Sequence, residues 1–445
     1  MWEGQEKKAV RTRGVKDFRL VWAGSTLSMT AFRTLGVSYP LIALALTGSP
    51  MAAGWVGFAS TIPGLLLYIP AGVLVDRFAP RRIMLCAEAA RGVAAASVFV
   101  ALLFGWASLT HLVLAATVEG ALWVLHSLAE TALIPSLVNR GQLPRALARS
   151  ETSFHVAVLT GRPLGGFLLG LGQAIPSAVN ALLFALSFVF LLRMKTDGVR
   201  QPRSPHLLVK VSDGVREVAR QPFLRTAMAL TAITNLMVNA LTMVFLAGSA
   251  ELSPLTVGLV LAGGGIGGAL GSFMILRIAP PPSMLFAQMW IWVAALGFAA
   301  LGGHPVFFGL ATLITGCTGA FSNITVRTFE AHEVALGKLA RVASVSRLTS
   351  RGAVSVAAPL GALLVTLFGV TWAAMVLFAA MALIAITVTA LPSLRGSLLP
   401  ARSRRSAPRE AVTVARSAGP PPRRDAWEAR APLPSAPAGP DRPLS

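Results

Sequence analysis

Long apolar blocks, separated by short breaks of Gly, Pro and polar residues, run through most of the chain. A helix that crosses a hydrocarbon core of about 30 Å needs about 20 residues. Twelve blocks reach that size, and each predicts one membrane-spanning helix: 18–46, 52–75, 83–104, 109–137, 151–172, 175–194, 223–247, 255–277, 284–302, 305–328, 344–368 and 372–392. Because the connections are short, neighbouring helices are expected to be antiparallel.

The predicted spans form two groups of six. The first group occupies 18–194, the second occupies 223–392, and a basic connector at 195–222 joins them. Residues 1–17 are a charged leader. Residues 393–445 contain ten Pro and ten Arg with much Ala and Ser. Such a segment cannot bury a core, so we expect a disordered, basic, Pro-rich tail.

The positions of Lys and Arg predict the orientation in the membrane. Of the 39 Lys and Arg residues, 34 lie in, or within three residues of, the leader, the connector, the tail or the loops on one side, and none lies in the six loops on the other side. Cytoplasmic loops carry the excess of Lys and Arg, so both termini are expected in the cytoplasm and the plasma (inner) membrane is the expected location. The net charge of +21 is then mostly a topology signal. A lipid bilayer is the expected partner, and nucleic acid is not.

The composition excludes an ordinary soluble enzyme. Apolar residues make up 54% of the chain and charged residues 13%, against about 25% charged residues in a soluble domain. The two cysteines, Cys86 and Cys317, lie inside apolar spans, so we expect neither a disulfide framework nor a metal site. The glycines at 263–268 also lie inside a span and lack a following Gly-Lys-Ser/Thr, so no nucleotide site is expected.

The connection after the second span carries a distinctive pattern: Gly72, then Asp76-Arg77, then Arg81-Arg82. A glycine at this position allows a neighbouring helix to approach closely. An aspartate at a helix end can accept hydrogen bonds from the start of another helix and can pair with arginine. Such a charge clamp favours one of two domain arrangements.

Segment 72–82 resembles the signature loop of the major facilitator superfamily, although Ala79 and Pro80 depart from the usual pattern. Further segments, in their order along the chain, resemble the enterobactin-exporter and macrolide-efflux branch of that superfamily: 47–50, 132–138, 182–188, 213–225, 263–268 and 359–361. The resemblance implies an all-α integral membrane fold of two pseudo-symmetric six-helix bundles. It also implies a central cavity lined by spans one, four, seven and ten, and transport by alternating access.

Span five contains Gly161-Arg162-Pro163 followed by Gly165-Gly166. Glycine and proline here predict close packing and a bend against the other half of the protein. The segment resembles the Gly-Pro-rich motif that the family associates with antiporters. Arg162 departs from that motif, which normally has a small residue beside the proline.

Several charged residues fall inside spans one, three and four. A charge near the bilayer centre costs about 2.5–3.5 kcal/mol on insertion scales, so such residues usually face a cavity or a partner. Arg33 and Glu119 both fall near the midplane, and they either pair with each other or face the substrate. Glu88 and Arg91 are three residues apart and predict a structural ion pair in span three.

Span four carries a polar stripe. Glu119, Trp123, His126 and Glu130 follow spacings of four, three and four residues, so they share one helical face. A carboxylate in a low-dielectric environment is harder to ionise, which suits it to carry a proton. We hypothesise that Glu119 is the main proton-coupling group and that His126 and Glu130 form a relay, with Arg33 nearby. The alternatives are a packing role for His126 and an end-of-helix role for Glu130.

Polar residues extend the predicted substrate cavity beyond Trp123. Thr231, Asn235 and Asn239 share a face of span seven, and Ser322 lies in span ten. Each can bond a substrate or a neighbouring helix, and a Ser or Thr hydroxyl can also bond its own backbone.

These features predict a secondary active transporter rather than an enzyme. No ATPase motif is present, so an ion gradient is the expected energy source, and no cofactor is expected. By resemblance, we expect a monomer that exports an amphipathic small molecule, such as a siderophore or a macrolide, in exchange for protons. Uptake or facilitated diffusion by the same fold is the alternative, and a membrane-embedded enzyme or non-transporting membrane partner is a remote one. Acidic and basic residues both line the predicted cavity, so the substrate charge stays open.

Overall fold

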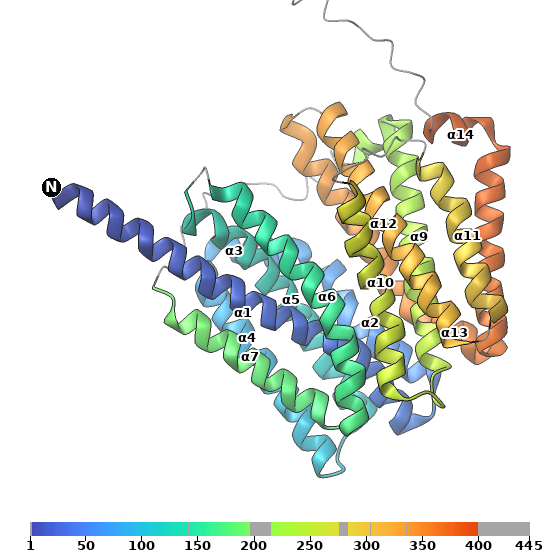
Figure 1. Ribbon diagram of the computed structural model, residues 1–445, viewed down its shortest axis with the longest axis horizontal. Helices are drawn as coiled ribbons and strands as arrows, with labels where there is room; N and C mark the ends of the chain where they lie inside the picture. The colour runs from blue at the N-terminus through green and yellow to red at the C-terminus, as the bar shows by residue number, and fades with distance from the viewer. Residues whose placement is uncertain are drawn as a thin grey trace, which may run out of the picture. The chain divides into compact units, whose positions relative to one another are not determined.

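A computed structural model describes residues 2–139, 142–195, 215–275, 284–302, 304–334 and 336–398, and these ranges contain helices and turns but no strand. The helices are α1 (Trp2–Thr47), α2 (Pro50–Leu66), α3 (Tyr68–Arg77), α4 (Pro80–Leu103), α5 (Leu109–Leu137), α6 (Leu143–Leu171), α7 (Ile175–Arg193), α9 (Pro222–Ala247), α10 (Pro254–Ile275), α11 (Met284–Gly302), α12 (Pro305–Glu333), α13 (Leu336–Ala390) and α14 (Pro392–Leu398) (Figure 1). The all-α class predicted from the apolar pattern is confirmed.

Proline and glycine explain where the helices begin and end. Pro50, Pro80 and Pro222 begin α2, α4 and α9, where the N–H that proline lacks has no intrahelical partner. Gly369, with φ of 77° and ψ of 171°, interrupts α13. Only glycine adopts that backbone conformation at low cost. The two parts of α13 therefore correspond to the last two predicted spans.

The second predicted span, 52–75, differs from a single straight helix. It consists of α2 and α3, which are bent by 61° relative to each other. Pro70 carries no N–H and so cannot bond the carbonyl of Leu66, which breaks the helix at Leu67. The bend re-aims the segment that carries the signature loop.

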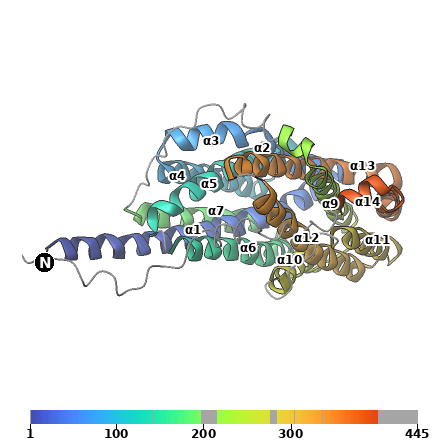
Figure 2. The same ribbon diagram turned by 90° about the horizontal axis from the view of Figure 1, so that it is seen from above.

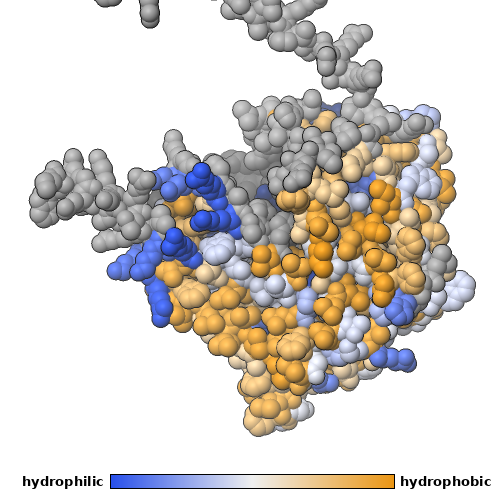
Figure 3. All heavy atoms as spheres, in the orientation of Figure 1, coloured by the Kyte–Doolittle hydropathy of each residue, from blue (hydrophilic) through white to orange (hydrophobic). Residues whose placement is uncertain are grey.

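Among the described residues, eight helices are long and apolar enough to cross a membrane, and the bent pair of α2 and α3 adds a ninth. Two shorter apolar helices, Val156–Leu171 and Met284–Ala300, coincide with two further predicted spans. Counting α13 as two segments, every predicted span has a helical counterpart. Large apolar side chains are exposed along these helices, and Figure 3 shows a broad hydrophobic surface, as expected where lipid replaces water.

The N-terminal half comprises α1–α7, and the C-terminal half comprises α9–α14 (Figures 1 and 2). The halves meet mainly where α2 packs on α13 and α6 packs on α10. We call the end of the bundle with Arg77, Arg81 and Arg82 the basic end. The end with the turns at 48–49, 104–108 and 172–174 is the opposite end.

Three predicted segments outside the spans differ in part from their expectation. The leader 1–17 is continuous with the first span, because α1 begins at Trp2. In the tail 393–445, residues up to Leu398 belong to α14, and the buried Leu398 joins the apolar core with α9 and α13. The tail therefore does not begin as a disordered segment at 393, and its residues 399–445 lie outside the described ranges. Of the connector 195–222, residues 196–214 also lie outside them.

Candidate functional site

A cavity lies between the two halves. It consists of two hollows, of about 170 Å³ and about 640 Å³, which share five lining residues: Phe32, Arg33, Ser60, Thr61 and Val354. The smaller hollow is deeper and touches helices of both halves, and the larger one continues along α5 and α13 toward the basic end. We call the two hollows together the central cavity. Their combined size suits a small molecule.

The halves are in close contact beyond the central cavity, toward the opposite end. A methyl group at Gly166 of α6 would overlap the backbone of Pro254 and Gly258 in α10, and one at Gly54 of α2 would overlap Ala362 in α13. A further apolar hollow of about 420 Å³ at the opposite end shares no lining residue with the central cavity. In this arrangement, the two halves are therefore in contact between the central cavity and the opposite end.

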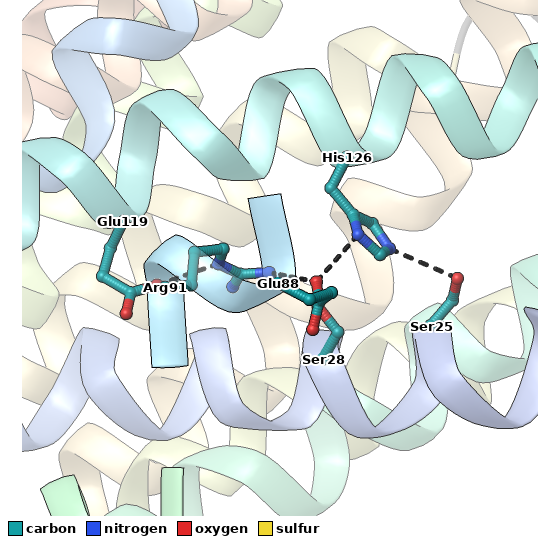
Figure 4. Close-up of polar contacts among 6 residues, drawn as sticks. All are labelled: Ser25, Ser28, Glu88, Arg91, Glu119 and His126. Atoms are coloured by element: carbon teal, nitrogen blue, oxygen red, sulfur yellow. Dashed lines mark hydrogen bonds and ion pairs between the residues drawn. The ribbon is translucent and has the colours of Figure 1, made fainter. Parts of the chain in front are cut away.

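A buried ion-pair cluster lies beside the cavity (Figure 4). Arg91 of α4 donates from Nε to Glu119 Oε2 of α5 at 2.9 Å. Its Nη1 donates to Ser28 Oγ of α1 at 2.6 Å and to Glu88 Oε1 at 3.1 Å. Ser28 Oγ in turn donates to Glu88 Oε1 at 2.7 Å. One guanidinium thus holds two carboxylates and joins three helices.

His126 of α5 extends this cluster toward the basic end. Its Nδ1 lies 2.8 Å from Glu88 Oε1, and its Nε2 lies 3.3 Å from Ser25 Oγ of α1. We call these residues the charge network: Ser25, Ser28, Glu88, Arg91, Glu119 and His126. All six are buried.

The charge network occupies a polar layer between two apolar clusters of the N-terminal half. One cluster packs Ile42 and Leu112 toward the opposite end, and the other packs Met84 and Leu133 toward the basic end. The Arg91 guanidinium also lies 4.2 Å from the ring centre of Phe184, a contact that stabilises a planar cation. The layer is therefore shielded from bulk water except where Glu119 reaches the central cavity.

The charge network contains one more carboxyl group than permanent positive charges. Glu88 and Glu119 are carboxylates, and Arg91 supplies one permanent positive charge. A second, uncompensated negative charge is costly in a low-dielectric interior. A neutral network therefore holds one further proton. Because the groups are coupled, that proton belongs to the network rather than to one residue.

The predicted stripe on α5 is divided between two environments. Glu119, Trp123 and Glu130 line the central cavity, and Trp123 stacks on Phe32 with ring centres 4.9 Å apart. His126 is fully buried against α4 and α1. Glu119 is therefore connected to His126 through Arg91 and Glu88 rather than by direct contact. Glu130 accepts a hydrogen bond from Ser150 Oγ at 3.3 Å.

Arg33 lies at the junction of the two hollows, as its depth in the first span predicted. Arg33 and Glu119 were predicted either to pair with each other or to face the substrate. Both side chains line the cavity, and Glu119 pairs with Arg91. Arg162 of α6 lines the same cavity.

Of the polar residues predicted to line the cavity from spans seven and ten, the structure brings Asn239 to it. Asn239 lines the central cavity, and its Nδ2 donates to the backbone oxygen of Asn235 at 2.8 Å. Thr231 and Ser322 line a separate small pocket within the C-terminal half, where Ser322 accepts from Gln288. The prediction of a cavity position is wrong for Thr231 and Ser322. Their faces are used for helix packing, which the residue types equally allow.

The glycines of the span-five motif serve two helix contacts. Gly161 and Gly165 pack on Thr34 and its neighbours in α1, within the N-terminal half. Gly166 and Pro163 pack on Gly258 of α10, in the other half. The predicted close approach of the two halves at this motif is confirmed.

Comparison with known proteins decides the family. A family model described as the Major Facilitator Superfamily matches residues 21–359, which is most of the chain. The chain belongs to this superfamily. It is therefore a multi-pass membrane transporter and not an enzyme.

Relatives of this transporter are named as efflux proteins. The multidrug efflux pump Tap of Mycobacterium tuberculosis is 28% identical over 296 residues, which cover 62% of this chain and 70% of the relative. The enterobactin exporter EntS of Salmonella typhi is 25% identical over 311 residues, with coverages of 64% and 73%. The branch suggested by the sequence motifs thus agrees with the names of the proteins to which this chain is similar.

Solved structures support the fold. A bacterial homologue of the iron transporter ferroportin, in an inward-facing state, has a TM-score of 0.63 at 16% identity, with 85% of this chain and 99% of that chain covered. The nucleoside transporter NupG has a TM-score of 0.62 at 13% identity, with coverages of 83% and 98%. The two-bundle fold of the superfamily is therefore confirmed.

In the present arrangement, the arginines of the signature loop contact α7 and a neighbouring aromatic ring. Arg81 donates from Nε to Leu191 O at 3.1 Å and from Nη2 to Leu192 O at 3.0 Å, so a cation caps the end of α7. The Arg77 guanidinium lies 5.9 Å from the ring centre of Phe78, and the neighbouring Arg82 is exposed.

The predicted clamp at Asp76 is not formed within the described ranges, where this half-buried carboxylate makes no hydrogen bond or ion pair. The prediction for Gly72 is wrong here, because a methyl group at this position would meet no atom within 4 Å. Both findings fit a clamp that belongs to the other arrangement of the halves.

Replacing Gly72 with Ala is expected to leave the thermal unfolding midpoint of the detergent-purified protein unchanged or raise it slightly. Alanine favours a helix over glycine by about 0.8–1 kcal/mol, and its methyl group has space here. Gly161→Ala is the matched control and should lower the midpoint, because its methyl group would overlap Arg33 Cβ. A clear drop for Gly72→Ala would reveal a close neighbour and contradict this placement.

Glu88 and Arg91 are further candidate functional residues, although the sequence predicted only a local ion pair between them. Their bond at 3.1 Å exists, but Glu88 also holds His126 and Arg91 also holds Glu119. A signal was present: in the antiparallel pair α4 and α5, Arg91 and Glu119 lie at similar distances along the chain from the connecting turn.

Proposed function

We propose that this protein exports amphipathic small molecules, such as siderophores or macrolides, across the plasma membrane in exchange for protons. In this proposal, both termini and the basic end face the cytoplasm, as the distribution of Lys and Arg predicts. The central cavity is then open inward and receives substrate from the cytoplasm. The relatives named as a multidrug efflux pump and an enterobactin exporter support export.

The observation that carries the proposal is the position of Glu119. This carboxylate lines the central cavity and is also bound to Arg91 of the charge network. Substrate in the cavity and a proton in the network therefore act on the same residue. A proton that neutralises Glu119 weakens its hold on Arg91, which still holds Glu88. Coupling follows if the two loaded states favour different arrangements of the halves.

Proton flux in everted membrane vesicles tests this proposal. The lumen is acidified, followed with a pH-sensitive dye, and challenged with siderophores, macrolides and lipophilic cations. A substrate of the wild-type protein should alkalinise the lumen, and Glu119→Gln should abolish that response, because glutamine cannot exchange a proton. Glu251→Gln, at an exposed acid outside the cavity, is the matched control and should keep it. An unchanged response in Glu119→Gln would rule out this coupling.

Uptake by the same fold makes the opposite prediction in intact cells. Cells that express the protein should contain less labelled substrate than cells without it if the protein exports. Higher accumulation that persists without a proton gradient would instead indicate uptake or facilitated diffusion.

A further inference from the structure

The central cavity carries more positive than negative side chains. Its positively charged lining residues are Arg33, Arg162, Arg347 and Arg351. Its negatively charged lining residues are Glu119 and Glu130. Membrane-embedded charges usually face a partner or a ligand pathway, so an excess of positive charge favours a negatively charged ligand.

The two lining carboxylates have partners other than Arg162 and Arg351. Glu119 is bound by Arg91 at 2.9 Å, inside the charge network. Glu130 lies toward the basic end and accepts a hydrogen bond from Ser150. The carboxylate nearest the deeper hollow is therefore already paired with a cation that is fully buried outside it.

The arginines come from both halves, and Arg33 lies where the two hollows of the central cavity meet. Arg162 and Arg351 are near enough to Arg33 for their charges to act on it. Arg162 Nη1 donates to Leu261 O at 3.3 Å, and the Arg351 guanidinium lies 5.0 Å from the ring centre of Tyr68. Within the part of the chain that the structure describes, neither Arg162 nor Arg351 has a carboxylate partner.

We propose that Arg33, Arg162 and Arg351 form a binding site for the anionic group of the substrate, so that the exported molecule is an amphipathic anion. This inference rests on the proposed function and specifies its substrate class. A guanidinium presents donors in a planar fork that matches carboxylate, sulfonate or phosphate oxygens. Apolar lining residues such as Phe32 and Met243 would hold the rest of the molecule.

The same site links binding to closure of the cavity. Arg33 and Arg162 belong to the N-terminal half and Arg351 belongs to the C-terminal half. When the cavity is empty, repulsion among like charges in a low-dielectric space opposes their approach. A bound anion reverses the sign of that interaction and draws the two halves together. The loaded protein therefore closes its basic end more readily than the empty one.

Equilibrium binding of a matched set of dansyl compounds to the full-length protein in neutral detergent tests the site. Dansylglycine is the anion, dansylamide is neutral, and dansylcadaverine is the cation. Binding is followed by energy transfer from tryptophan, since Trp123 lines the cavity. Dansylglycine should bind most tightly, and Arg162→Gln or Arg351→Gln should weaken it about 10-fold to 100-fold. Arg162→Lys should weaken it less, and Arg220→Gln, at an exposed arginine, should not change it.

Three results would overturn the inference: no saturable dansylglycine binding, tighter binding of dansylcadaverine, or unchanged dansylglycine binding in both arginine variants. Displacement of dansylglycine by phosphatidylglycerol but not by phosphatidylcholine would assign the arginines to a lipid headgroup and also overturn it. The assay contains no gradient and no second compartment. Its outcome is therefore separate from proton coupling and direction, which the vesicle experiment decides.

Discussion

Replacing Arg91 with Met is expected to destabilise the purified protein by about 3–5 kcal/mol, the usual cost of removing one partner from a buried ion pair. Arg91 is fully buried and holds Glu88 and Glu119 together with Ser28. Without its guanidinium, two carboxylates are left between two apolar clusters. Methionine fills much of the volume, so the loss reports the charge rather than a cavity.

Thermal unfolding of Arg91→Met and of the double variant Arg91→Met/Glu119→Gln measures this effect. The second change removes one of the two stranded carboxylates, so the double variant should be more stable than Arg91→Met alone. Arg220→Gln, an exposed arginine, should unfold like the wild type. If the effects of the two network changes were simply additive losses, the two side chains would not share a network.

Replacing Gly166 with Val should reduce transport at least about tenfold. The two halves touch here, and even a methyl group at Gly166 would overlap the backbone of Pro254 and Gly258 in α10. Backbone atoms of a packed helix cannot yield as a flexible side chain does. The variant must therefore separate α6 from α10 on the opposite-end side of the cavity. The arrangement that receives substrate from the basic end then loses its stability.

Gly170 provides the matched control for Gly166. It lies one turn further along α6, and a methyl group there meets only Pro254 Cβ, at an ordinary contact distance of 3.8 Å. Gly170→Ala should transport like the wild type. Initial transport rates in everted vesicles and spin-label distances between α6 and α10 would distinguish the two variants. A normal rate and an unchanged distance in Gly166→Val would show that this contact does not hold the halves together.

The positions of the spans could be predicted because the hydrocarbon core imposes a length and an apolar composition on each crossing helix. The same reasoning placed Arg33 and Glu119 at one depth, and both line the cavity. It could not predict the bend at Leu67, since prolines such as Pro63 also lie inside helices that continue. Local backbone chemistry permits a break without requiring one.

The partners of Glu119 could not be predicted from span four alone. Helical spacing shows which residues share a face, but it does not show which neighbouring helix that face meets. His126 shares the stripe with Trp123, yet it turns to Glu88 of α4 while Trp123 lines the cavity. Likewise, the sequence allowed Ser322 to bond either a substrate or a neighbouring helix. It accepts a hydrogen bond from Gln288 because α11 packs beside α12.

Gradient-driven transport by the protein alone, in proteoliposomes, tests the central claim most directly. Liposomes with an acidic lumen, and with the basic end of the protein outward, are given labelled substrate, with and without nigericin to collapse the gradient. We expect accumulation far above equilibrium that nigericin and Glu119→Gln each abolish and that Glu251→Gln leaves unchanged. Equal entry with and without the gradient, or full accumulation by Glu119→Gln, would contradict a proton-coupled exporter that uses this charge network.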